Sequence, residues 1–192
     1  MLADEQDPNY FAGLEALDSA DLLVLSVRRR TLPEGQLAKI RAYVEAGKPL
    51  AALRTSSHAF ALRSGEPPKG HDVWPEFDRE ILGGNYHNHF GTKLKTFVKR
   101  SPAAKDHPIL AGVPAEEFPV TSSLYKNHPI ADAATVLVTG RVEGVEQHEP
   151  VAWTYDRDGQ RVFYTSLGHP GDFENEAFRL MLTNAVAWGI AP

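Results

Sequence analysis

The stretch DLLVLSVRRRTLPEGQLAKIRAYVEAGKPLAALRTSSH, residues 21–58, decides the fold class of this chain. Its two apolar runs, 21–27 and 49–53, are continuous rather than alternating, as a strand covered on both faces requires. Between them, Pro33 is suited to the first turn of a helix and Gly47 is suited to end it. Strand, helix, short turn and strand form a βαβ unit, so we expect the two strands to be parallel neighbours.

The rest of the chain adds further helices and strands to this unit. Amphipathic segments predict helices at 11–17, 75–82 and 175–190, and apolar patterns predict strands at 92–100, 118–125, 134–142, 151–155 and 161–166. The polar turn 156–159 between the last two strands predicts a hairpin. The sequence contains no internal repeat and no linker, so residues 1–192 are expected to form a single α/β domain.

The composition excludes several classes of site. The chain has 192 residues, a net charge of −5 and no cysteine. A cysteine nucleophile, a disulfide and a thiolate metal site are therefore excluded, and the acidic balance argues against nucleic-acid binding. No apolar run reaches the roughly 18 residues that span a membrane. The N-terminus lacks the apolar core of a signal peptide, so a cytoplasmic protein is expected.

Polar clusters follow three of the predicted strands, at 26–30, 54–58 and 168–172. In open α/β sheets, ligands bind beyond the carboxyl ends of the strands, so these clusters are expected to border one cleft. A fourth cluster, 74–89, combines acidic and histidine side chains with the pair Gly83-Gly84, and we expect it to form a rim.

Several of these side chains also have a structural interpretation. Ser56 and Ser57 are more often helix caps than nucleophiles. Asp172 is suited to the N-terminus of the last helix. Glu76 and Asp78 are either acid/base partners or charges in the first turn of a helix.

The basic and aromatic side chains leave similar alternatives open. Arg28 and Arg29 either line the cleft or, as we favour from the sequence, form a solvated basic turn. The rings of Tyr125, Trp153 and Tyr164 could stack on a sugar, but filling the core is the default for aromatic residues in such strands.

His87 and His89 suggest a metal site, which would need Glu76 or Asp78 as a further ligand. However, the His-x-His spacing is common by chance, and the chain has no HExxH motif. We therefore expect a histidine-rich pocket rim with no metal and no other cofactor.

Four segments resemble the ThuA-like (trehalose utilisation) family. They are PLAALRTSSHAF (49–60), WPEFD followed by LGGNYH (within 74–87), LYK (124–126) and YTSLGH (164–169). These motifs occur in the family's order and extend over nearly the whole chain. Because that family is similar in fold to class I glutamine amidotransferases, the resemblance implies a flavodoxin-like, mostly parallel sheet with helices on both faces.

The resemblance also implies a difference at the N-terminus. Related chains begin with an additional β-α-β segment whose first strand would lie at the centre of the sheet. This chain is expected to lack that segment, which would leave an exposed sheet edge. A stable protein is therefore expected either to have reordered strands or to form a homo-oligomer in which a partner covers the edge.

The function implied by the resemblance is sugar catabolism. The substrate would be an oxidised (keto) disaccharide or a glycoside, and the enzyme would be a hydrolase or lyase. Amidotransferases carry a nucleophilic cysteine on a strained strand-to-helix elbow, a position that Arg54 occupies here. Arginine is always protonated and cannot attack carbon, so glutaminase activity is excluded.

The leading hypothesis gives each polar residue of the cleft a role. Arg54 would hold an anionic or carbonyl oxygen, while His169 would transfer a proton with help from Glu76 or His87. Further contacts to the carbohydrate are expected from Ser56, His58, Tyr86, His89 and Asp172. A noncatalytic carbohydrate-binding or assembly domain is the second hypothesis, and a metal-dependent hydrolase is the third.

Overall fold

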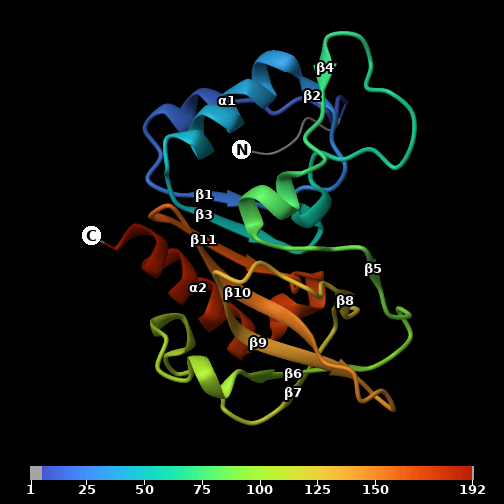
Figure 1. The fold of residues 1–192 in the computed structure, drawn as a ribbon, viewed down its shortest axis with the longest axis vertical. Coiled ribbons are helices and arrows are strands. Elements are labelled where there is room, and N and C mark those ends of the chain that lie inside the picture. The colour runs from blue at the N-terminus through green and yellow to red at the C-terminus, as the bar shows by residue number, and fades with distance from the viewer. Residues whose placement is uncertain (1–5, 192) are drawn as a thin grey trace.

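The computed structural model describes residues 6–191, which are built around a seven-stranded sheet (Figure 1). The strands of this sheet are β1 (Leu23–Leu25), β3 (Leu50–Leu53), β6 (Thr96–Arg100), β7 (Phe118–Val120), β9 (Ala134–Val142), β10 (Glu149–Arg157) and β11 (Gln160–Thr165). Their order across the sheet is β1-β3-β11-β10-β9-β6-β7. Short strands form two further pairs, β2 (Leu32–Pro33) with β4 (His71–Asp72) and β5 (Asn88–His89) with β8 (Tyr125–Lys126).

Two long helices and several short helical turns complete the described part of the chain. The long helices are α1 (Glu34–Glu45) and α2 (Glu176–Ile190). The short turns are η1 (Leu14–Asp18), η2 (Arg54–His58), η3 (Asp78–Leu82), η4 (Pro102–Ala104), η5 (Pro108–Leu110) and η6 (Pro170–Glu174). Of these, η3 is a wide π-helical turn and the others are 3-10 turns.

The βαβ unit predicted from residues 21–58 is confirmed. Strands β1 and β3 are parallel, with Leu23 opposite Leu50. Helix α1 begins directly after Pro33, and Gly47 has the positive φ of 70° that suits a glycine after a helix.

The expectation of a mostly parallel sheet is wrong. Only the β1–β3 and β3–β11 pairs are parallel, whereas the β11–β10, β10–β9, β9–β6 and β6–β7 pairs are antiparallel. The connections explain this result, because parallel neighbours need a crossover of about a dozen or more residues. The turn Asp158-Gly159 between β10 and β11 and the connection 143–148 between β9 and β10 are too short, so the α/β fold contains a mixed sheet.

Strand β3 is buried on both faces of the sheet. Leu50 and Ala52 pack in an apolar cluster with residues of α1, whereas Ala51 and Leu53 pack in a second cluster with residues of α2. This two-sided burial accounts for the continuous apolar run that the sequence shows at 49–53.

Strand β1 lies at one edge of the sheet (Figure 1). The side chain of Val24 in this strand is 51% exposed, and a groove of about 380 Å³ lies along β1. The homo-oligomer expected from the sequence stays a prediction.

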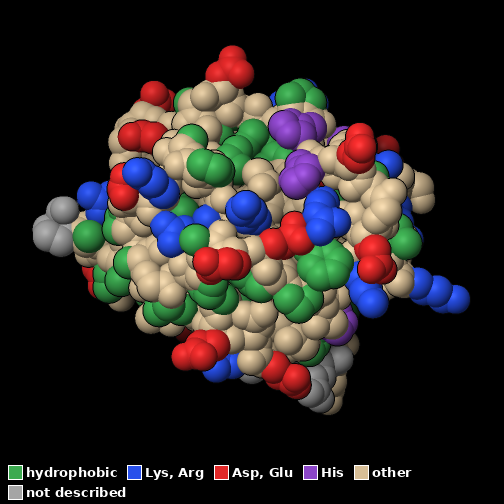
Figure 2. Space-filling view, turned by 90° about the horizontal axis from the view of Figure 1, so that it is seen from below, with side chains coloured by type: hydrophobic (Ala, Val, Ile, Leu, Met, Phe, Trp, Pro, Cys, Tyr) green, Lys and Arg blue, Asp and Glu red, His purple; other side chains and the backbone are tan. Residues whose placement is uncertain are grey.

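On one face of the molecule, charged side chains of both signs are interspersed. Figure 2 shows acidic and basic residues interspersed on the face seen from below. Among residues 6–191, no helix is both long enough and apolar enough to cross a membrane.

We expect the Gly140→Ala variant to be less stable than the wild type. A Cβ atom at Gly140 would lie 2.7 Å from Val151 Cγ2 and 2.9 Å from Leu124 Cδ1. Overpacking of this kind costs about 1–3 kcal/mol. The matched control is Gly35→Ala in α1, where a Cβ meets nothing within 4 Å and stability should rise by roughly 0.5–1 kcal/mol. Urea unfolding measures both changes, and equal midpoints for the two variants would contradict the packing argument.

Candidate functional site

The turn that follows β3 is strained at Arg54, whose φ is 48°. This left-handed conformation costs a residue other than glycine about 1–3 kcal/mol. Three hydrogen bonds hold the turn: the Tyr164 hydroxyl donates to the Arg54 carbonyl at 2.7 Å, Arg54 Nη1 donates to the Ser166 carbonyl at 3.0 Å, and Nη2 donates to Ser123 Oγ at 3.3 Å. Arg54 therefore lies at a strained strand-to-helix turn, as the resemblance implies, with its guanidinium bonded across the strand ends.

Ser56 joins this turn to the end of β1. Its buried hydroxyl donates to the Leu25 carbonyl at 2.9 Å and accepts from the Val27 N–H at 3.1 Å. Both bonds are internal to the fold, so the structure gives Ser56 a role in positioning the turn. Its predicted contact with substrate stays a prediction.

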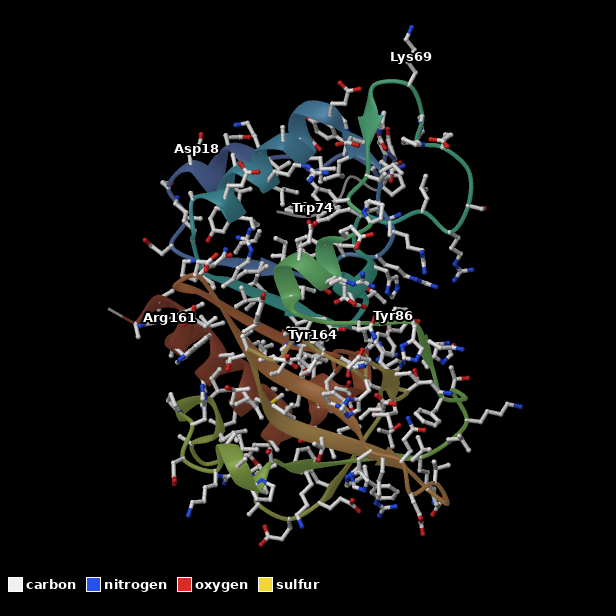
Figure 3. All side chains as sticks on the ribbon, in the orientation of Figure 1. Asp18, Lys69, Trp74, Tyr86, Arg161 and Tyr164 are labelled. Carbon is white, nitrogen blue, oxygen red and sulfur yellow. The ribbon has the colours of Figure 1, made fainter. Side chains whose placement is uncertain are left out.

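A cavity of about 280 Å³ opens between η2 and the segment 75–87. It is lined by four of the predicted site residues, His58, Glu76, Tyr86 and His87. The rings of His58 and Tyr86 stack with centroids 4.7 Å apart, and the ring of Tyr125 lies 4.5 Å from that of Tyr86. Figure 3 shows Tyr86 near the carboxyl ends of β1 and β3, whereas Tyr164 lies in the middle of the sheet.

Asp78, the first residue of the π-helical turn η3, also lines this cavity. Its carboxylate is buried: Oδ2 accepts the Tyr86 N–H at 2.7 Å, and Oδ1 has no hydrogen-bond partner among residues 6–191. Burial raises the pKa of this carboxyl to about 7, and the Tyr86 bond and the charge of Arg79 oppose the shift only in part. A Cβ atom on Gly84 would lie 2.3 Å from Oδ1, so only glycine fits beside the acid.

His58 has the opposite shift. Burial and, to a smaller extent, nearby positive charges together lower the pKa of its imidazole to about 4, and the charges act in the order Arg29, Arg28, Arg63 and Arg54. At neutral pH the imidazole is therefore uncharged, while the carboxyl of Asp78 holds a proton in about half of the molecules. Two titratable groups whose pKa values are displaced in opposite directions in one cavity are typical of acid/base sites.

His169 and Asp172 lie outside this cavity. His169 is exposed and its Nδ1 accepts the Gly171 N–H at 3.2 Å, at the start of η6. Asp172 is fully buried, and its oxygens accept the backbone N–H groups of Thr121, Ser122, Gly168 and His169 as well as the Ser122 hydroxyl. The structure therefore uses Asp172 to hold the 168–172 loop, and the proposed roles of both residues in the reaction stay predictions.

Arg54 and His89 also lie outside the cavity, on either side of Tyr125. The guanidinium carbon of Arg54 is 5.0 Å from the centroid of the Tyr125 ring, and the His89 ring is 6.4 Å from it. His89 is exposed and its Nδ1 is bonded to the Phe90 carbonyl at 2.7 Å. Both residues contact Tyr125, and the tilted ring of Tyr125 in turn contacts Tyr86 at the cavity.

The ligand geometry of a metal site does not form within residues 6–191. No group of three His, Asp or Glu side chains gathers there closely enough to hold an ion. His87 Nδ1 is instead bonded to the Asn85 carbonyl at 3.0 Å. The histidine loop thus forms part of the pocket rim.

Sequence reasoning undervalued Asp78 and Arg29, which both line the cavity. The sequence feature that could have indicated Asp78 is the pair Gly83-Gly84 after an acidic turn. Gly84 has no side chain, and this leaves room for the Asp78 carboxylate. Arg29 carried no such signal, because its place depends on how the 26–30 loop packs on η2. The core interpretation of Trp153 is supported, because the ring is fully buried and its Nε1 donates to the Leu82 carbonyl at 2.7 Å.

Comparison with known proteins gives one family and a set of similar structures. The family model described as ThuA, trehalose utilisation, matches residues 2–189. No curated protein matches the chain.

Two ThuA-like proteins are among the similar solved structures. The one from Bacteroides uniformis is 18% identical with a TM-score of 0.65, covering 92% of this chain and 71% of its own. The one from Parabacteroides merdae is 19% identical with a TM-score of 0.64, covering 91% and 72%. Cytoplasmic Protein STM1381 from Salmonella typhimurium LT2 is 15% identical with a TM-score of 0.58, covering 93% and 76%. At these identities the similarity shows the fold alone.

We expect stability to depend on pH through Asp78. Its pKa rises from 3.8 to about 7 on folding, so between about pH 4 and 7 the folded state keeps a proton that the unfolded state has lost. As the pH rises through this range, the free energy of unfolding therefore falls by up to about 1.4 kcal/mol per pH unit. In Asp78→Asn this contribution is absent, so the variant should gain stability relative to wild type until about pH 7 and then keep a constant difference.

Wild type and Asp78→Asn are compared because His58 also makes stability depend on pH, in the opposite direction. Since His58 is present in both proteins, its contribution cancels in the difference. Its pKa falls from 6.5 to about 4 on folding, so its contribution to stability is lost as the pH falls through that range. Urea unfolding of both proteins from pH 4 to 8 measures the difference. Parallel stability curves would show that Asp78 titrates normally.

Proposed function

The chain belongs to the ThuA (trehalose utilisation) family, and from this membership we propose that it binds and processes a sugar derivative in the cavity between η2 and residues 75–87. The observation that carries the proposal is the state of Asp78. This buried carboxyl has a pKa of about 7 and one oxygen without a partner in the described chain, and it lines the same cavity as two stacked rings.

The size and lining of the cavity suit one sugar ring. Its volume of about 280 Å³ is near the lower end of ligand pockets, about 300–1,000 Å³. The stacked rings of His58 and Tyr86 offer an apolar surface, while Glu76, Asn85 and His87 offer hydrogen-bonding groups at the rim. A second ring of a disaccharide would then extend toward solvent.

Asp78 is the group that would transfer the proton. A catalytic acid or base is most effective when its pKa is close to the working pH. The carboxyl could protonate the glycosidic oxygen of a leaving sugar while water adds at carbon. In a keto sugar, the carboxylate could instead take the proton from the carbon beside the carbonyl, after which the glycosidic oxygen leaves with its electron pair.

This proposal moves proton transfer from His169 to Asp78, because His169 does not line the cavity. Glu76 and His87 keep a place at its rim, where either could bind hydroxyl groups or exchange the proton with solvent. His58 is uncharged at neutral pH and can accept a hydrogen bond from a sugar hydroxyl at Nε2, since its Nδ1 lies 3.1 Å from Ser57 Oγ.

A noncatalytic carbohydrate-binding domain is the second candidate. One observation favours it: the polar side chains of Arg54, Ser56 and Asp172 at the strand ends all form hydrogen bonds with the backbone of neighbouring segments. Such a domain would need only the ring pair and the rim. The two candidates differ in whether Asp78 changes the bound sugar.

Calorimetric titration with trehalose and with its oxidised keto form, followed by NMR of the sugar signals, tests the proposal. Tyr86→Ala should weaken binding by about tenfold, because a lost ring contact of about 1.4 kcal/mol corresponds to that factor. Asp78→Asn should retain binding and lose turnover by about a hundredfold or more. Asp72→Asn, a matched change of a carboxylate outside the cavity, should alter neither.

The outcomes separate the candidates. Binding of a sugar that remains unchanged would favour the noncatalytic domain. Loss of turnover in His169→Ala but not in Asp78→Asn would return proton transfer to His169. If neither sugar binds, the choice of trehalose derivatives as ligands is wrong.

A further inference from the structure

The charges of four arginine side chains act on His58, and none of the four has a carboxylate partner within the described residues. The loop that carries two of them is fixed on η2, since the Arg29 N–H donates to the His58 carbonyl at 3.0 Å and the Arg30 N–H donates to the Ala59 carbonyl at 2.7 Å. The cluster comprises Arg28, Arg29, Arg54 and Arg63, whose charges all act on the imidazole. Within residues 6–191, no acidic side chain lies within 4 Å of any of their guanidinium nitrogens.

Two arginines outside the cluster do have such partners. Arg41 lies 3.6 Å from Asp72, and Arg141 lies 2.6 Å from Glu117 in a two-bonded pair. The cluster around His58 is distinguished by the number of its arginines, since four such charges act on one imidazole.

Arg29 has two features that are energetically unfavourable. Its φ of 50° is left-handed, and its Nε is buried with no hydrogen-bond partner in the described residues. Both conditions are unfavourable for folding. The guanidinium makes one bond, from Nη1 to the Ala61 carbonyl at 3.3 Å, while the side chain lines the cavity.

The acids in the same cavity do not neutralise this charge. Asp78 is buried and keeps its proton in about half of the molecules at neutral pH, and the cation whose charge acts on its pKa is Arg79 rather than Arg29. Glu76 is exposed and forms no ion pair with the cluster. Burial and the charges of Arg63 and Arg28 lower the pKa of Arg29, as expected where like charges are close together. A bound anion would relieve that repulsion.

We propose that the ligand of this cavity is an anionic sugar derivative whose carboxylate or phosphate oxygens are bound by Arg29. Arg28 and Arg63 add positive potential at the same side. The inference rests on the proposed function, because it places the sugar ring against His58 and Tyr86. A guanidinium suits this task because it is always charged and can donate two parallel N–H bonds to two oxygens of one group.

Calorimetric titration of the full chain with glucose, glucuronate, glucose 6-phosphate and inorganic phosphate tests this inference. At least one of the charged sugars should bind tenfold or more tightly than glucose, and added salt should reduce that preference. The tighter of the two identifies the oxyanion as carboxylate or phosphate. Inorganic phosphate alone should bind more weakly than the preferred charged sugar, because it lacks the ring that stacks.

Variants locate the effect. Arg29→Gln should remove the preference for the charged sugar over glucose. Arg63→Gln should reduce the preference by two- to threefold. It changes an exposed side chain, so it retains the test if Arg29→Gln fails to fold. Arg41→Gln is the matched control outside the cavity and should keep the full preference.

Two results would overturn the inference in different ways. Glucose that binds as tightly as both charged sugars contradicts the anion site and leaves the proposed sugar function intact. Inorganic phosphate that binds as tightly as glucose 6-phosphate, and loses affinity in Arg29→Gln, contradicts the sugar function and leaves an anion site.

Discussion

The hydroxyl of Tyr164 donates to the Arg54 carbonyl at 2.7 Å, and this bond ties β11 to a turn whose backbone would otherwise relax. Arg54 adopts a left-handed conformation that is unfavourable for its residue type, so contacts from outside the turn must stabilise it. Ser56 adds a second tie, to the end of β1. With the turn fixed at both neighbouring strands, His58 is held where it stacks on Tyr86, and the 26–30 loop can bond to the backbone of η2. The cavity is thus a consequence of how the turn after β3 is anchored.

Elements with strong local patterns could be predicted from the sequence. The β1–α1–β3 unit, the 134–142 strand and the final helix lie where their apolar periodicity places them. The hairpin predicted at 156–159 is confirmed, because β10 and β11 are antiparallel, but the sheet as a whole was expected to be mostly parallel because the family resemblance was given more weight than the connection lengths. The sequence itself contains Asp158-Gly159, a two-residue turn that enforces an antiparallel pair. Strand direction is a property of connections, so the hairpin signal was the better guide.

The sequence places the polar strand-end clusters at one edge of the sheet, but it does not show which of their side chains face the same cavity. The strand-end clusters do lie near one another, because parallel strands β1, β3 and β11 end at one edge. Which side chains face a cavity depends on tertiary contacts that no local pattern records. Asp172 and Asp78 show the difference: both are buried carboxylates at the start of a helical turn, yet backbone N–H groups surround one and leave an oxygen of the other unpaired. A sequence cannot distinguish them, since the donors for Asp172 include residues some fifty positions away.

The charged groups around the cavity influence the protonation states of Asp78 and His58. Burial raises the pKa of Asp78 to about 7, so at neutral pH about half of the molecules carry no negative charge there to offset the nearby guanidinium groups. Burial of His58, reinforced by those groups, keeps its imidazole uncharged. An oxyanion bound at Arg29 would act on both residues in the same direction, because a nearby negative charge raises the pKa of a carboxyl and of an imidazole alike. By linkage, proton uptake at Asp78 and binding of an anionic ligand would favour each other. The charge that identifies the ligand would then also help to hold on Asp78 the proton that the reaction needs.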